Sequence, residues 1–231
     1  MKFNAFQAVD IAIQLAVILF AISFHESAHA WSALKFGDTT ARDLGRISLN
    51  PLRHLDPFGS VLLPIMMYLL SNGRFIFAAA KPTPVDLRRT RNPRLANLVV
   101  SAAGPVSNFL LASAAMLLLV GIRRGAPEAI GGLYEALRGD RIAAGALVPI
   151  AYVLFHFAQI NLLLGVFNLI PLPPLDGSGV VVSALGAPAA RLYATIAPFG
   201  FLILILLIMT PFLSWIFTPF RRLLWLLTFG A

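Results

Sequence analysis

The sequence has no cysteine and few charged residues, and both absences restrict what the protein can be. Without cysteine, disulfide frameworks and thiolate metal sites are excluded, so any metal must be held by histidine, carboxylate or water. Charged residues make up 12% of the 231 residues, against about 25% in soluble domains. Because 58% of the residues are hydrophobic, we expect the lipid bilayer to be part of the solvent of this chain.

Acidic residues are scarcer than basic ones: 10 against 18, which gives a formal net charge of +8. In a soluble protein this balance would suggest a nucleic-acid partner. Here the basic residues lie mainly between apolar runs, and no aromatic–basic recognition motif occurs. We therefore expect no nucleic acid among the partners and interpret the basic residues as determinants of membrane orientation.

Long apolar runs organise the chain. Those long enough to form membrane helices cover residues 6–34, 95–122, 144–170, 190–210 and 212–229. The first run has no cleavage site and contains ionisable residues, so it reads as a retained helix and not as a signal peptide. The predicted fold class is an all-α polytopic membrane protein, with a three-helix core in residues 1–186 and additional membrane helices in 187–231.

Residues 42–49 and 74–80 are predicted to form a small membrane-associated β element. Residues 58–70 are too short to span comfortably, and the sequence leaves open whether they cross the membrane. If they do not, the loops of 37–94 lie on one side and carry more Lys and Arg than 123–143. This bias predicts that 37–94 face the cytoplasm.

The first apolar run contains His25-Glu26-x-x-His29. Residues four apart share a helix face, so both imidazoles can reach one cation, with Glu26 about 100° further round. The spacing is typical of zinc proteases, in which the metal lowers the pKa of a water and the glutamate accepts its proton. A chance match is the alternative, but charged groups in an apolar run cost about 2.5–3.5 kcal/mol each, which favours a functional site.

A catalytic zinc takes three protein ligands, and Asp176 is the best candidate for the third. It follows three prolines and precedes Gly177, where a regular helix is broken. Such backbone at membrane depth is tolerated where it is buried in protein or lines a wet cavity. We expect one zinc per chain, held by His25, His29 and Asp176; the alternative is an aspartate that caps the following helix.

Three motifs in this order resemble the site-2 protease family of intramembrane zinc metalloproteases. They are His25-Glu26-x-x-His29, Gly104-Pro105-x-x-Asn108 and Asn168-x-x-Pro171-x-Pro173-x-x-Asp176-Gly177. The resemblance covers about residues 6–186 and implies a small bacterial-type member without a PDZ or nucleotide-sensing domain. It implies cleavage of transmembrane segments of other membrane proteins in the cell membrane of a prokaryote. It also implies that Asp176 binds zinc and that Asn168 helps to hold the substrate or the developing oxyanion.

Other candidates are open to two interpretations. Asn108 is a substrate-binding candidate or a packing residue, and His54 is a metal or substrate contact or, more simply, a loop hydrogen bond. His156 and Asn161 suit hydrogen bonds between helices. A metal transporter or sensor with the same ligands, or a pseudoprotease that does not cleave, are the alternative functions. Glu26 distinguishes a peptidase from a metal transporter, because transport needs only metal ligands whereas hydrolysis also needs a base.

Overall fold

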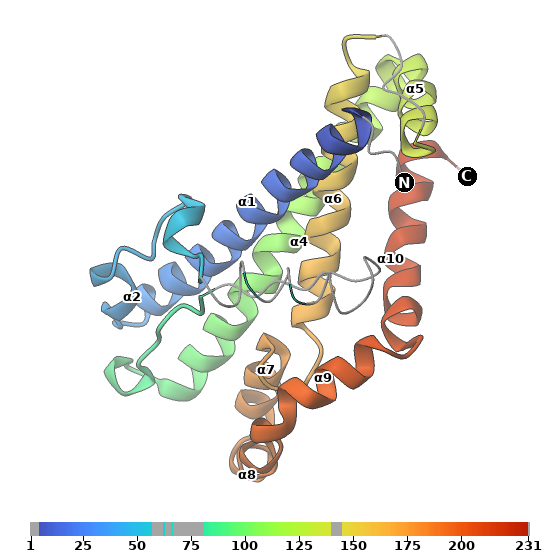
Figure 1. Ribbon diagram of the computed structural model, residues 1–231. Helices are drawn as coiled ribbons and strands as arrows, with labels where there is room; N and C mark the ends of the chain where they lie inside the picture. The colour runs from blue at the N-terminus through green and yellow to red at the C-terminus, as the bar shows by residue number, and fades with distance from the viewer. Residues whose placement is uncertain (1–4, 57–61, 63–65, 67–80, 140–144, 231) are drawn as a thin grey trace.

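The computed structural model describes residues 5–56, 62, 66, 81–139 and 145–230, and most of these residues are helical (Figure 1). The helices are α1 (Ala5–Lys35), α2 (Thr40–Asp43), η1 (Pro51–Arg53), η3 (Leu87–Arg89), α4 (Pro93–Gly125), α5 (Pro127–Leu137), α6 (Val148–Asn168), α7 (Asp176–Leu185), α8 (Ala187–Ile196), η4 (Ala197–Phe199), α9 (Gly200–Ile208) and α10 (Phe212–Phe229). No strand occurs in this described part of the chain. The predicted all-α class is confirmed.

Four helical segments are long and apolar enough to cross a membrane. They are Ala5–Lys35, Pro93–Gly125, Val148–Asn168 and Ala187–Ile208. The three predicted core spans and the first predicted C-terminal span are therefore found as helices of sufficient length. The last predicted span, α10, forms a helix but does not join these four, because Arg221 and Arg222 in its middle lower its hydropathy.

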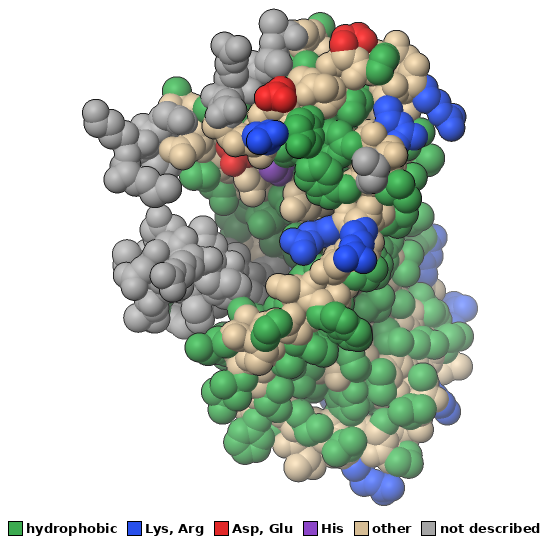
Figure 2. All heavy atoms as spheres, turned by 90° about the vertical axis from the view of Figure 1, so that its right-hand side faces the viewer, with side chains coloured by type: hydrophobic (Ala, Val, Ile, Leu, Met, Phe, Trp, Pro, Cys, Tyr) green, Lys and Arg blue, Asp and Glu red, His purple; other side chains and the backbone are tan. Residues whose placement is uncertain are grey.

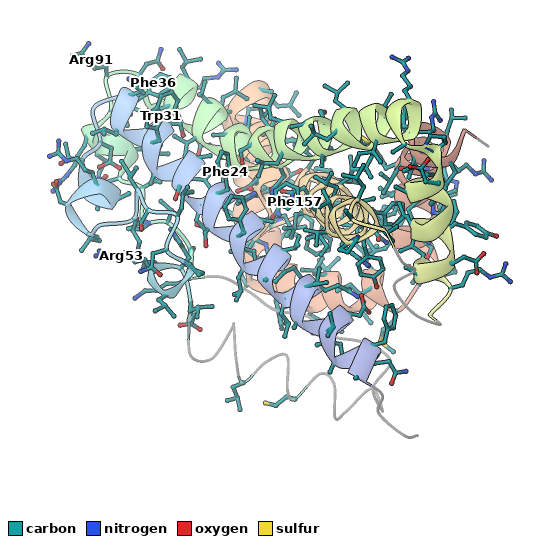
Figure 3. All side chains as sticks on the ribbon, turned by 90° about the horizontal axis from the view of Figure 1, so that it is seen from above. Phe24, Trp31, Phe36, Arg53, Arg91 and Phe157 are labelled. Atoms are coloured by element: carbon teal, nitrogen blue, oxygen red, sulfur yellow. The ribbon has the colours of Figure 1, made fainter. Side chains whose placement is uncertain are left out.

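Helices α1, α4 and α6 form the central bundle, seen along its length in Figure 1 and from above in Figure 3. Small buried residues, among them Ala112 and Ala158, let these helices approach closely. Gly165 of α6 serves the same end, since a Cβ there would lie 3.1 Å from the Phe109 ring of α4. Helix α7 packs on α4, and α10 rises beside α6 (Figure 1).

The β element predicted for residues 42–49 is wrong. The chain there leaves α2 through a turn in which Gly45 has a φ of 68°. The Ser48 carbonyl accepts hydrogen bonds from Ser27 Oγ (2.6 Å) and from His54 Nε2 (2.7 Å). Side chains thus satisfy backbone groups that a partner strand would otherwise pair. The other predicted half, 74–80, lies outside the described residues, as do 58–70 apart from 62 and 66.

Candidate metal centre

The three predicted ligands meet where the start of α7 packs against α1 and α4. The Nε2 atoms of His25 and His29 lie 3.0 and 3.3 Å from Asp176 Oδ2. The three ligand atoms all lie within 4.8 Å of one another, and both histidines are buried. The fold thus joins two residues of the first helix to one that is distant in sequence.

Hydrogen bonds on the far side of each ring set the protonation of the two histidines. His25 Nδ1 lies 2.6 Å from Asn108 Oδ1, and His29 Nδ1 lies 2.6 Å from the Val100 carbonyl oxygen. Both partners are acceptors, so each Nδ1 carries a proton and donates it. In the neutral rings, each Nε2 then directs a lone pair toward Asp176, as metal-binding histidines do.

The arrangement around Asp176 fits a metal cation. Its Oδ2 is buried and has no hydrogen-bond partner. Two imidazole lone pairs and a carboxylate oxygen repel one another at 3.0–3.3 Å unless a proton or a metal ion lies between them. Two imidazole nitrogens and one carboxylate oxygen are a donor set of catalytic zinc sites, which keep a fourth position open. The residues present therefore fit zinc.

Gly104 of α4 makes room for both imidazoles. A Cβ at this position would lie 2.4 Å from His29 Nε2 and 2.5 Å from His25 Nε2. Real Cβ atoms do not approach so closely, so only glycine allows α4 to pack against the paired rings. The glycine of the second sequence motif therefore acts directly at the metal centre.

The turn before α7 presents Asp176. Leu172 N donates to the Ile170 carbonyl and Leu175 N to the Leu172 carbonyl, both at 2.8 Å, so the broken backbone is hydrogen-bonded within the turn. Ile170 and Leu175 are buried and pack against Leu204 of α9. Helix α9 thereby supports the turn that carries the carboxylate.

Glu26 is held by a residue that the sequence analysis did not identify. Its Oε2 accepts hydrogen bonds from the backbone N–H of Thr83 (2.9 Å) and from Thr83 Oγ1 (2.7 Å). Thr83 lies in the non-helical segment 81–86, where Pro82 and Pro84 flank it. The two prolines are the feature of the sequence that could have drawn attention to Thr83, because they favour extended backbone at the residue between them.

Segment 81–86 is fixed at both ends, so that Thr83 is placed over Glu26. Lys81 N donates to the His54 carbonyl (2.8 Å), and Asp86 N donates to Asp38 Oδ2 (2.7 Å). Asp38 is fully buried and also accepts from Thr40 N and Thr40 Oγ1. Burial alone would raise the pKa of Asp38, but these hydrogen bonds outweigh it and hold the pKa below its usual value.

One more backbone hydrogen bond joins the segment after residue 86 to the C-terminal end of α1. Arg91 N donates to the Phe36 carbonyl at 3.2 Å, and Figure 3 shows the two residues together at the end of α1. The stretch from Lys81 to Arg91 thus follows the C-terminal end of α1, which carries His25, Glu26 and His29. We name residues 81–86 the Thr83 strap.

Asn108 of α4 lies behind His25 and hydrogen-bonds to both α1 and α6. It is fully buried, and its Nδ2 donates to Asn161 Oδ1 (2.8 Å) while its Oδ1 faces His25. Asn161 Nδ2 in turn donates to the Phe157 carbonyl (2.9 Å). Asn161 therefore makes the interhelical hydrogen bond expected of it. A substrate contact for Asn108 stays a prediction, whereas its contact with a metal-site histidine is seen directly.

The remaining candidates are not brought into the three-ligand cluster. Asn168 ends α6, is half-buried, and donates from Nδ2 to the Leu164 carbonyl (3.0 Å). His54 is buried and makes the loop hydrogen bond to Ser48. His156 Nε2 lies 3.4 Å from Asp10 Oδ1, so it pairs with α1 away from the cluster. Roles for Asn168 and His54 in binding substrate stay predictions.

The fold and this centre define a class: a membrane-embedded metallopeptidase. The model of peptidase family M50 matches residues 13–209. A Bacillus subtilis protein named "Putative zinc metalloprotease YwhC" is 39% identical over 206 residues, which cover 88% of this chain and 84% of that protein. Proteins named "Putative zinc metalloprotease Rip2" from Mycolicibacterium smegmatis and Mycobacterium tuberculosis H37Rv are each 31% identical over 200 residues, 86% of this chain and 68% of theirs.

The chain belongs to peptidase family M50, and the resemblance to site-2 proteases is confirmed. The matched range contains His25, Glu26, His29, Gly104 and Asp176. No solved structure matches the chain with significance.

Proposed function

We propose that the protein is a zinc-dependent intramembrane endopeptidase that hydrolyses peptide bonds in or near transmembrane segments of other membrane proteins. One zinc per chain would be held by His25, His29 and Asp176. The observation that carries the proposal is the convergence of two Nε2 lone pairs on the buried Asp176 Oδ2, with Glu26 adjacent to His25. The family and the names of the relatives support the same reaction.

A zinc ion in this centre would polarise the scissile carbonyl and lower the pKa of a water. Glu26 then accepts the proton of the attacking water and passes it to the leaving amine. Thr83 holds one carboxylate oxygen, Oε2, through two hydrogen bonds. These two hydrogen bonds restrict the orientation of the carboxylate, and Oε1 is the oxygen that would accept the proton.

Asn108 and the Val100 carbonyl keep the histidines ready to bind. By accepting the Nδ1 protons they fix both rings in the tautomer with Nε2 unprotonated. Partners of this kind are typically worth 10–100-fold in metal affinity. We therefore assign Asn108 a positioning role toward His25, and its substrate contact stays a prediction.

The substrate would be a single-span membrane protein whose helix opens near the cut. In a regular helix the scissile carbonyl is engaged in a hydrogen bond and the backbone is enclosed, so hydrolysis requires local unwinding. Asn168, at the end of α6 and before the turn that carries Asp176, would contact the opened segment, and its position near the metal centre supports this assignment. The basic loops near the catalytic end of α1 favour a cytoplasmic active site in the cell membrane of a prokaryote.

The test compares Glu26→Gln with wild type in cells that express candidate single-span membrane proteins. The amide has nearly the size of the carboxylate but cannot accept the proton, so zinc should remain and cleavage should cease. Glu128→Gln, an exposed change on α5, is the matched control. Cleavage at the wild-type rate by Glu26→Gln would show that Glu26 is not the base. Zinc binding without any cleavage by wild type would favour a metal transporter, sensor or pseudoprotease.

A further inference from the structure

Helix α10 carries two adjacent arginines, Arg221 and Arg222, that are exposed in the middle of an apolar helix. Their exposed neighbours are apolar: Trp225 is 40% exposed and Leu226 52% exposed. Figure 2 faces this side of the molecule and shows basic side chains surrounded by hydrophobic ones. Among the described residues, neither arginine forms an ion pair or a hydrogen bond.

The contacts of α10 put these arginines at membrane depth. Arg123 Nη1, two residues before the end of α4, donates to the Leu226 carbonyl at 3.1 Å, which ties the C-terminal end of α10 to that of a spanning helix. Leu224 is 1% exposed and belongs to the core that α4 and α6 share. Arg221 lines a hollow together with Gln159, near the middle of the 21-residue span α6. Helix α10 is thus packed along the bundle and does not lie on the membrane surface.

The direction of the side chains keeps the charges at that depth. Helical side chains point toward the N-terminus of their helix, here away from the end that Arg123 marks. Phe217, one turn before Arg221, lines the same hollow. A guanidinium at this depth is unfavourable against lipid unless a carboxylate or another polar group pairs with it.

Among the described residues, the membrane-spanning helices offer no spare carboxylate near mid-depth, since Glu128 and Glu135 lie on α5, beyond the end of α4. No acidic residue follows Asp176 in the sequence, and none lies between Asp56 and Asp86. On the first helix, Asp10 is engaged by Tyr152 and Gln14, and Glu26 by Thr83. A second copy of this chain is therefore a poor source of a counter-charge at mid-membrane.

We propose that Arg221 and Arg222 form a docking site for another membrane protein whose spanning helix carries an Asp or Glu near mid-depth. The guanidinium and the carboxylate are each unfavourable in lipid, and a bidentate pair satisfies both. The exposed apolar side chains beside the arginines, Trp225 and Leu226, pack against the residues that flank the carboxylate. Binding at this site does not depend on the proposed peptidase activity.

Side chains of α10 and α4 connect this docking site to the metal centre. Phe220, next to Arg221, stacks on Phe109 of α4 with ring centroids 6.4 Å apart. Phe109 is adjacent to Asn108, which holds His25. Two side-chain contacts, Phe220–Phe109 and Asn108–His25, therefore connect α10 to a predicted metal ligand.

The experiment uses a synthetic leucine–alanine spanning helix with a central Glu, and the same helix with Gln. Each synthetic helix is labelled with a donor dye and is placed in phosphatidylcholine vesicles together with the protein. The protein has no cysteine, so Ser214→Cys on α10 provides a single site for the acceptor dye. We expect energy transfer to report binding of the Glu helix at least about tenfold tighter than the Gln helix.

Variants separate charge from packing. In R221L/R222L the preference for Glu should vanish, while R221K/R222K should keep most of it. Arg191→Leu, an exposed basic residue on α8, should leave the preference unchanged. Leucine suits a membrane helix, and helix content by circular dichroism verifies that R221L/R222L still folds.

Four results would overturn the proposal. One is equal binding of the Glu and Gln helices by wild type, and another is a Glu preference that persists in R221L/R222L. The third is loss of the preference when phosphatidylglycerol is added, which would assign the arginines to lipid phosphate. Energy transfer between two copies that requires Arg221 would likewise replace the partner helix by self-association.

Discussion

Replacing Gly104 by alanine is the most informative single change near the metal centre, because it adds one methyl group where both imidazoles pack. The new Cβ would lie 2.4 Å from His29 Nε2 and 2.5 Å from His25 Nε2. Ordinary contact needs about 3.5 Å, so each ring must retreat by about 1 Å from α4. The Nδ1 partners, Val100 and Asn108, both belong to α4, so the retreat stretches both 2.6 Å hydrogen bonds.

The expected loss of zinc affinity follows from these displacements. A hydrogen bond lengthened from 2.6 Å by about 1 Å no longer qualifies as one. Zinc sites tolerate errors of roughly 0.2 Å in ligand distance. If each disturbed imidazole weakens zinc binding by about 10–100-fold, two together weaken it by roughly 10²–10⁴-fold.

The assay titrates purified protein with a zinc chelator of graded affinity and measures residual metal by atomic emission. Gly121→Ala is the matched control, since it lies on the same helix and its Cβ would meet nothing within 4 Å. We expect Gly121→Ala to bind zinc as wild type does and Gly104→Ala to lose it. Wild-type affinity and cleavage by Gly104→Ala would refute the packing argument.

Three further predictions test the surroundings of the site. Asn108→Leu should weaken zinc binding by about 10–100-fold, whereas Asn108→Asp keeps an acceptor for His25 and should retain most of the affinity in the same titration. The pKa of Asp38 is lowered on folding, so its stabilisation is complete above the ordinary value of 3.8 and is lost as pH falls through the lower folded value. Asp38→Asn should therefore flatten the acid limb of thermal stability in detergent; an unchanged acid limb would contradict this. In a substrate helix, replacing Gly, Pro or Asn near the cut by Leu should slow cleavage on a gel-based time course, because unwinding becomes harder; equal or faster cleavage across several such changes would contradict it.

The sequence predicted the features that depend on local spacing and on broken helices. His25 and His29 lie one helical turn apart, so their common face follows from helix geometry. Asp176 could be anticipated because prolines interrupt the helix before a lone carboxylate in an apolar region. The structure brings these three residues together, as the three-helix core requires.

Contacts that depend on the path of a loop could not be predicted. No sequence spacing relates Thr83 to Glu26, because the contact depends on the path of the Thr83 strap, which hydrogen bonds to His54 and Asp38 hold beside α1. The β prediction for 42–49 failed for a related reason. A short polar–apolar alternation does not reveal that Ser27 and His54 will satisfy the backbone in place of a strand.

The central claim is that His25, His29 and Asp176 together hold one zinc, and Asp176→Asn tests it most directly. The change keeps the size of the side chain but removes the charge, and an amide oxygen is a poor zinc ligand. Zinc measured after equilibration with a chelator should be about one per chain in wild type and nearly absent in Asp176→Asn, with the variant still inserted in the membrane. Stoichiometric zinc held by Asp176→Asn at wild-type affinity would contradict the account.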